Sequence, residues 1–154
     1  MDARAQSAAL KTGEISSLEL MDATVARIEA VNGDVNAIVS LRDAEQLRDE
    51  ARAADNSPRS DWLHGMPIAI KDLANAKGLP TSMGSPMFAG QVAQADDLMV
   101  ARLRAAGAII IGKTNTPEFG LGSHTFNPVH GATRNPYDLG KSSGGSSGGA
   151  AAAL

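Results

Sequence analysis

Residues 65–72 read Gly65-Met66-Pro67-Ile68-Ala69-Ile70-Lys71-Asp72, and the character of the chain changes here. Its glycine and proline mark a boundary, and the apolar run at 68–70 predicts a short buried strand. A second apolar run at 108–111 predicts another buried strand. Between them, Asp96 or Asp97 can cap a helix that runs through Ala106, with Gly107 as its stop. The order strand, helix, strand indicates a crossover unit, so we expect an α/β fold.

The region before this stretch is predicted to be helical. Ser16 and Glu19 have the spacing of a capping box, and Asn32-Gly33 supplies a stop, which predicts a first helix between them. A short apolar piece at 37–39 follows, and a second helix is predicted over 41–54. Residues 55–61 form a polar loop, which separates this helical region from the strand at 68–70.

Fewer regular elements are expected in the second half of the chain. Residues 78–96 are rich in Gly, Pro and Ser and predict a long ordered loop. Thr116-Pro117-Glu118 is typical of an N-cap followed by a proline in the first turn of a helix. Residues 120–149 show almost no regular pattern, and a helix is predicted to begin at 150–154.

The composition is that of one globular domain and excludes several classes of function. The chain has 154 residues, with 43% hydrophobic and 20% charged, which is enough for one core. A formal charge of −3 without a basic patch argues against nucleic acid as a partner. The apolar runs are too short to cross a membrane. The absence of cysteine excludes disulfides and thiol chemistry, and we expect a cytoplasmic protein.

Two features could carry chemistry. Lys71 directly follows a predicted buried strand. A lysine there is usually a solvated charge, but one held inward has its pKa lowered by desolvation and can act as a general base. The Gly- and Ser-rich residues 141–149 could be a linker, or a backbone turn that brings hydroxyls close to a reacting group. A lysine paired with a serine would form a Ser–Lys hydrolase site.

Four ordered blocks resemble the amidase-signature family, namely residues 65–72, 112–120, 131–137 and 144–149. Their sequences GMPIAIKD, GKTNTPEFG, GATRNPY and GGSSGG are similar to that family's motifs, and residues 14–20 and 27–32 are similar to its N-terminal helix. The resemblance implies the N-terminal part of a single amidase domain. Residues 1–61 would form a helical region and residues 62–154 the start of the catalytic core, with helices around a mixed β-sheet that is incomplete at the C-terminus.

The resemblance also implies the chemistry, which is hydrolysis of carbon–nitrogen amide bonds by a Ser–cisSer–Lys triad. Lys71 matches the base, and Ser146 matches the bridging serine, which has an unusual cis peptide bond in the family. The nucleophilic serine and the oxyanion loop are expected beyond Leu154, so we expect residues 1–154 alone to be inactive. Gly120 and Ser147 are expected to bind the substrate, a small-molecule amide. The resemblance implies no metal and no organic cofactor.

Several side chains are expected to have lesser roles. We expect Asp72 to orient Lys71 or to cap a turn. Lys113 also lies near a strand end, but the family places no base there. His64, His124 and His130 lack the spacing of metal ligands, so we expect structural or surface roles, with His124 a candidate for the wall of the substrate pocket.

Three alternatives stay open. The parent protein could be the amidotransferase subunit that supplies ammonia for transamidation of mischarged tRNA, although residues 116–120 are more similar to the general amidases. The chain could also be a binding or structural module without catalysis, or an enzyme that uses a Ser146–Lys71 dyad. A homodimer is compatible with the sequence.

Overall fold

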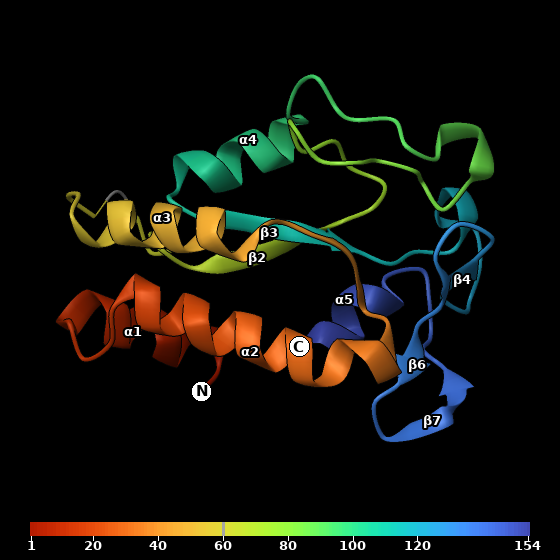
Figure 1. Cartoon of the computed structure of the whole chain (residues 1–154), viewed down its shortest axis with the longest axis horizontal. Helices are drawn as coiled ribbons and strands as arrows, with labels where there is room; N and C mark the ends of the chain where they lie inside the picture. The colour runs from red at the N-terminus through yellow and green to blue at the C-terminus, as the bar shows by residue number, and fades with distance from the viewer. Residues whose placement is uncertain (60) are drawn as a thin grey trace.

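A three-stranded mixed sheet lies at the centre of the structure, and helices cover both of its faces (Figure 1). This computed structural model describes residues 1–59 and 61–154, so residue 60 of the loop predicted at 55–61 lies outside the described residues. The α-helices are α1 (Ala3–Thr12), α2 (Ser17–Val35), α3 (Ala44–Asp55), α4 (Leu98–Ala105) and α5 (Gly148–Ala153). The strands are β1 (Ile38–Leu41), β2 (Pro67–Lys71), β3 (Ile109–Thr114), β4 (Phe126–Asn127), β5 (Gly131–Ala132), β6 (Arg134–Asn135) and β7 (Asp138–Ser142). The 3₁₀ turns are η1 (Pro86–Phe88) and η2 (Glu118–Gly120).

Strand β3 occupies the middle of the sheet, antiparallel to β1 and parallel to β2. The connection from β2 to β3 passes through α4, which confirms the crossover predicted from the two apolar runs. The pairing of β2 with β3 skips Ile111, because Ile68 pairs with Ile110 while Ala69 pairs with Gly112. A bulge of this kind reverses the alternation of side chains beyond it.

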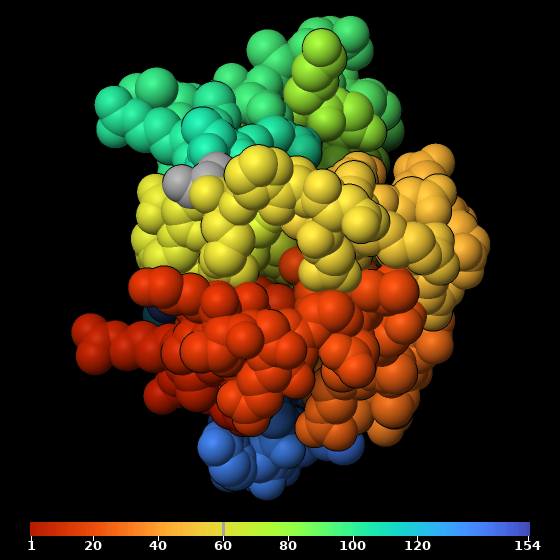
Figure 2. Space-filling view, turned by 90° about the vertical axis from the view of Figure 1, so that its left-hand side faces the viewer, coloured from red at the N-terminus to blue at the C-terminus, as the bar shows by residue number. Residues whose placement is uncertain are grey.

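Two apolar clusters pack on opposite faces of the sheet. On one face, Ile70 of β2 and Ile110 of β3 pack with Val100 of α4. On the other, alternate residues of β3 pack with the inward sides of α2 and α3, namely Met21, Val25, Leu47, Ala51, Ile109 and Ile111. Figure 2 shows the molecule from the side, with α1 and α2 in red and orange below α3 in yellow, and the segment around α4 in green and teal above.

The start of α2 is confirmed in detail. The side chain of Ser16 accepts a hydrogen bond from the backbone N–H of Glu19, and the Glu19 carboxylate accepts one from the N–H of Ser16. The carboxylate of Asp55, at the end of α3, also accepts bonds from the N–H groups of Ser17 (2.6 Å) and Leu18 (3.1 Å). One helix therefore caps the other, which fixes the angle between them.

The predicted end of α2 is wrong. Gly33 lies inside the helix, which continues to Val35 and ends where Asn36 adopts a left-handed conformation with φ of 54°. The side chain of Asn32 accepts hydrogen bonds from the N–H groups of Ala37 and Ile38, so it joins the end of α2 to β1 instead of stopping the helix.

Other boundaries also differ from those predicted. Helix α3 begins at Ala44, because residues 38–41 pair with β3 and Asp43 caps the helix. Helix α1 was not predicted, although Asp2 caps its start and Gly13 ends it with a positive φ. The helix expected after Thr116 is only the short turn η2. Residues 120–149 contain two small hairpins, β4–β5 and β6–β7. No helix within the described residues has the length and hydropathy needed to cross a membrane.

Candidate active site

Lys71 meets the signature turn, which comprises residues 144–149, at one end of the sheet. Lys71 is the last residue of β2 and is half-buried. Its Nζ lies 2.9 Å from Oγ of Ser146 and 3.0 Å from Oγ of Ser147. Burial lowers the pKa of Lys71, because desolvation disfavours the charged ammonium. The structure thus brings together three of the four site residues expected from the sequence.

The turn that carries Ser146 is built on close backbone contacts. The peptide bond between Gly145 and Ser146 is cis, as the family resemblance implied. A Cβ on Gly149 would lie 2.3 Å from the backbone N of Asn115, so only glycine allows this approach to the end of β3. The N–H of Gly145 donates to the carbonyl of Ser123 at 2.7 Å. The turn is therefore held between the end of β3 and residues 122–125.

Two buried threonine hydroxyls also contact this turn. Thr125 Oγ1 donates to the carbonyl of Gly144 at 3.1 Å and accepts from the N–H of Gly148 at 3.0 Å. Thr116 Oγ1 lies 3.3 Å from the carbonyl oxygen of Ser146. Neither threonine has measurable exposed surface. Neither was predicted from the sequence, because no local pattern indicates which hydroxyl a distant turn will contact.

Asp72 directly follows Lys71, but its side chain lies on the other face of the sheet, with Lys113. Its carboxylate accepts hydrogen bonds from the N–H and the hydroxyl of Ser82, and it lies 3.3 Å from Nζ of Lys113. His130 Nε2 lies 3.6 Å from the same carboxylate. Of the two roles expected for Asp72, the structure shows the one that holds a turn, at Ser82.

The residues around Asp72 stabilise its carboxylate in the charged form. Desolvation raises its pKa, but hydrogen bonds from His130 and Ser82 and the charge of Lys113 outweigh this and hold the pKa below its ordinary value. Desolvation lowers the pKa of Lys113, while Asp72 opposes that shift. Lys113 also donates hydrogen bonds to the carbonyls of Ala74 and Pro80, so its buried ammonium has polar partners in place of water.

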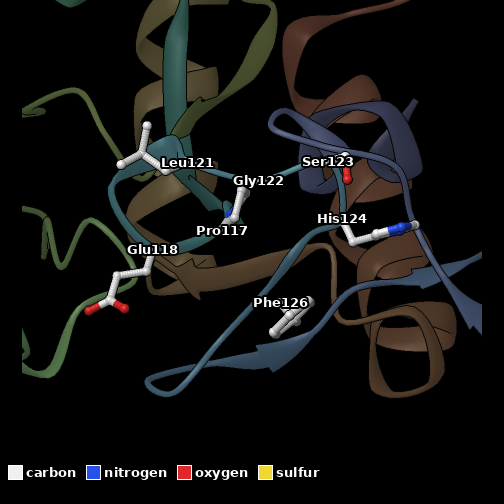
Figure 3. Close-up of a pocket in the computed structure, with 7 residues that line it drawn as sticks. All are labelled: Pro117, Glu118, Leu121, Gly122, Ser123, His124 and Phe126. Atoms are coloured by element: carbon white, nitrogen blue, oxygen red, sulfur yellow. The ribbon is translucent and has the colours of Figure 1, made fainter.

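A pocket of about 400 Å³ opens beside the signature turn (Figure 3). Residues 122–124 line it, and the backbone of the same residues packs against Gly145. His124 also lines this pocket, and its ring lies 3.3 Å from the hydroxyl of Ser142. In Figure 3, Glu118 and Leu121 lie on the side of Pro117 away from His124. The pocket is thus adjacent to the turn that carries Ser146.

Gly120, the fourth expected site residue, is placed by a different contact. It ends the turn η2 with φ of 73°, and a Cβ there would lie 2.6 Å from Cδ1 of Leu73. It therefore packs against the segment that follows Lys71, next to the pocket residue Leu121.

Known proteins match this chain over nearly its whole length. A family model described as Amidase matches residues 19–154. The A subunit of glutamyl-tRNA(Gln) amidotransferase from Roseiflexus sp. (strain RS-1) is 46% identical over 95% of this chain and 30% of its own length. An acylamidase from Rhodococcus erythropolis is 41% identical over the full chain and 33% of its own length.

A solved structure of an amide-hydrolysing enzyme has the same fold as this chain. The 6-aminohexanoate cyclic dimer hydrolase in complex with its substrate superposes with a TM-score of 0.89 at 40% identity. That superposition covers 99% of this chain and 31% of the hydrolase, so the chain spans about a third of the length of the proteins it matches. The family model and these relatives agree, and the chain belongs to the amidase-signature family.

Proposed function

We propose that the full-length protein is an amidase that hydrolyses carbon–nitrogen bonds through a Ser–cisSer–Lys triad, with residues 1–154 as the N-terminal part of its single catalytic domain. Lys71 is the base and Ser146 the bridge. The observation that carries the proposal is the 2.9 Å contact between Lys71 Nζ and Ser146 Oγ. The nucleophilic serine and the oxyanion loop lie beyond Leu154 in this proposal.

The geometry supports a proton relay. A neutral Lys71 accepts the proton of the Ser146 hydroxyl, and Ser146 in turn accepts the proton of the nucleophilic serine as that serine attacks the amide carbonyl. The two heavy atoms lie within the range that proton transfer requires. The same path returns the proton to the departing nitrogen, which leaves an acyl-enzyme that water hydrolyses. Burial supports this role, because it lowers the pKa of Lys71.

The proposed substrate is a small-molecule amide that binds near the pocket lined by residues 117–126. Ser147 and Gly120 are the proposed substrate-binding residues within this chain. The relatives support an amide without naming one, since one is an acylamidase and another a cyclic dimer hydrolase. The hydroxyl of Ser147 also contacts Lys71, so it can orient the amine while Ser146 exchanges a proton with it.

A second candidate is the A subunit of a glutamyl-tRNA(Gln) amidotransferase. The 46% identity with the Roseiflexus protein favours it. The two candidates differ in their need for other subunits. Purification of the tagged protein from its native cells separates them, because an amidotransferase component would co-purify with partner subunits in a fixed ratio. An independent amidase would hydrolyse amides after purification alone.

The test of the proposed function is labelling of the full-length protein with a fluorophosphonate, which reacts with activated serines. We expect one adduct, mapped by mass spectrometry to a serine beyond Leu154. The variants Lys71→Met and Ser146→Ala should abolish labelling, while Lys11→Met, at an exposed position in α1, should not. An adduct on Ser146 or Ser147 would overturn the assignment of Ser146 as the bridge.

The isolated residues 1–154 provide the complementary measurement. We expect no labelling and no turnover from them, because loss of the nucleophile removes covalent catalysis. Turnover by this piece would favour a Ser146–Lys71 dyad instead. A stable, monodisperse fold that is inactive even in the full-length protein would favour a binding or structural module.

A further inference from the structure

A single hydroxyl joins the two sides of the turn that carries Ser146. Thr125 Oγ1 donates to the carbonyl of Gly144 and accepts from the N–H of Gly148, at 3.1 and 3.0 Å. The first contact lies two residues before Ser146 and the second lies two residues after it. The hydroxyl therefore closes the turn into a ring, and the serine lies at the middle of the closed segment.

The surroundings of Thr125 hold this hydroxyl in place. The N–H of Thr125 donates to the carbonyl of Ser143 at 3.0 Å, and its carbonyl accepts from the N–H of Thr133 at 2.9 Å. The threonine has no exposed surface, so water does not compete for either hydroxyl contact. A Cβ on Gly148 would lie 2.2 Å from Oγ1. Glycine at 148 is thus what allows the hydroxyl to reach the backbone.

A second hydroxyl makes a weaker contact with the same turn. Thr116 Oγ1 lies 3.3 Å from the carbonyl of Ser146 and 3.1 Å from that of Pro117. One hydroxyl proton is shared between these two acceptors, and the contact with Ser146 is the longer one. Thr125 uses its hydroxyl both as donor and as acceptor on the turn, so it constrains Ser146 more strongly.

We propose that Thr125 is a positioning residue that holds Ser146 at proton-transfer distance from Lys71. This inference rests on the proposed function, because it assigns Thr125 to the relay between those two residues. Thr125 acts through the backbone of the turn and touches no reacting atom. Displacement of a reacting group by about 1 Å can lower the rate about 100-fold, so a loosened turn lowers the rate of proton transfer.

The experiment compares three variants of the full-length protein. Thr125→Val keeps the shape and removes the hydroxyl, and Thr125→Ser keeps the hydroxyl and removes a methyl group. Thr133→Val is the matched control, because Thr133 is equally buried and its hydroxyl donates to the carbonyl of Asn36, away from the turn. The readouts are kcat and KM for p-nitroacetanilide, and the second-order rate of fluorophosphonate labelling, which needs no known substrate.

We expect Thr125→Val to lower kcat and the labelling rate about 10- to 100-fold. Thr125→Ser and Thr133→Val should retain rates close to those of the wild type. A folded Thr125→Val variant with wild-type rates would overturn the inference. So would a Thr125→Ser variant as slow as Thr125→Val, because the hydroxyl would then not be the cause, or an equal loss in Thr133→Val.

A second variant keeps the test decisive if Thr125→Val fails to fold. Gly148→Ala places a methyl group 2.2 Å from Oγ1 and so displaces the hydroxyl, and we expect the same loss of kcat. A folded and fully active Gly148→Ala variant would overturn the inference. Absence of turnover and labelling in the wild type would remove the proposed function together with this inference, whereas an active wild type with unaffected variants would remove the inference alone.

Discussion

Lys113 and Asp72 form an ion pair whose charged atoms lie 3.3 Å apart, with side-chain exposures of 0% and 2%. Lys113 lies on β3 beyond the bulge that reverses the alternation of side chains, so it faces the same side of the sheet as Ile70. Asp72 directly follows Lys71. The pair therefore ties the end of β2 to β3 at the residue next to the proposed base.

Replacing Lys113 by methionine should lower the free energy of unfolding by about 3–5 kcal/mol, because the carboxylate of Asp72 stays buried without its partner. Urea denaturation measures this loss. The double variant Lys113→Met, Asp72→Asn should lose less, because neither charge remains. Lys141→Met is the matched control, since Lys141 pairs with Asp138 on the surface, where solvent screening leaves an ion pair with little effect on stability. Equal losses for Lys113→Met and Lys141→Met would contradict the prediction.

The parts of the fold that could be predicted from the sequence are those with local signals. The runs at 68–70 and 108–111 became β2 and β3, and Ser16 with Glu19 capped α2 as expected. Each of these signals lies within a few consecutive residues, and in this protein the tertiary contacts agree with it.

The parts that were missed depend on contacts between distant residues. Gly33 indicated a helix end, but Asn36 took the left-handed position because its side chain reaches the carbonyl of His130. The hairpins within 120–149 have strands as short as two residues, too short to show a period. At the candidate site, the family resemblance predicted roles for Lys71 and Ser146, and their Nζ and Oγ atoms lie 2.9 Å apart. The contacts of the Thr125 hydroxyl with Gly144 and Gly148 could not be predicted, because these glycines lie 19 and 23 positions away along the chain.

Two glycines provide a test of packing. A Cβ on Gly112 would lie 2.2 Å from the carbonyl oxygen of Ser40, where β1 pairs with β3. Gly112→Ala should therefore destabilise the protein by about 1–3 kcal/mol. Gly33 lies inside α2 with no atom within 4 Å of its added Cβ, so Gly33→Ala should stabilise it by about 0.5–1 kcal/mol. Thermal denaturation of both variants checks the opposite signs, and a shift in the same direction would contradict the geometry.

The cap that Asp55 provides for α2 should contribute measurably to stability. Its carboxylate accepts bonds from two N–H groups at the start of the helix, those of Ser17 and Leu18. Asp55→Ala should lower the free energy of unfolding by about 0.5–2 kcal/mol, as for other lost caps. Asp49→Ala, in the same helix, removes an exposed pair with Arg52 and should cost about 0.5 kcal/mol or less. An equal effect of both substitutions in urea denaturation would show that the cap is not formed.

The pH dependence of hydrolysis should follow Lys71. Protonated Lys71 cannot accept the proton of Ser146, so kcat/KM should fall as the pH drops through the pKa of Lys71 and rise to a plateau above it. Burial lowers that pKa, so the fall should lie at lower pH than for an ordinary lysine. The measurement is kcat/KM of the full-length protein across pH. Lys71→Arg keeps a positive charge that does not dissociate, so its rate should be low at every pH, whereas Lys11→Met should keep the wild-type profile. A Lys71→Arg variant with the wild-type profile would show that another group accepts the proton.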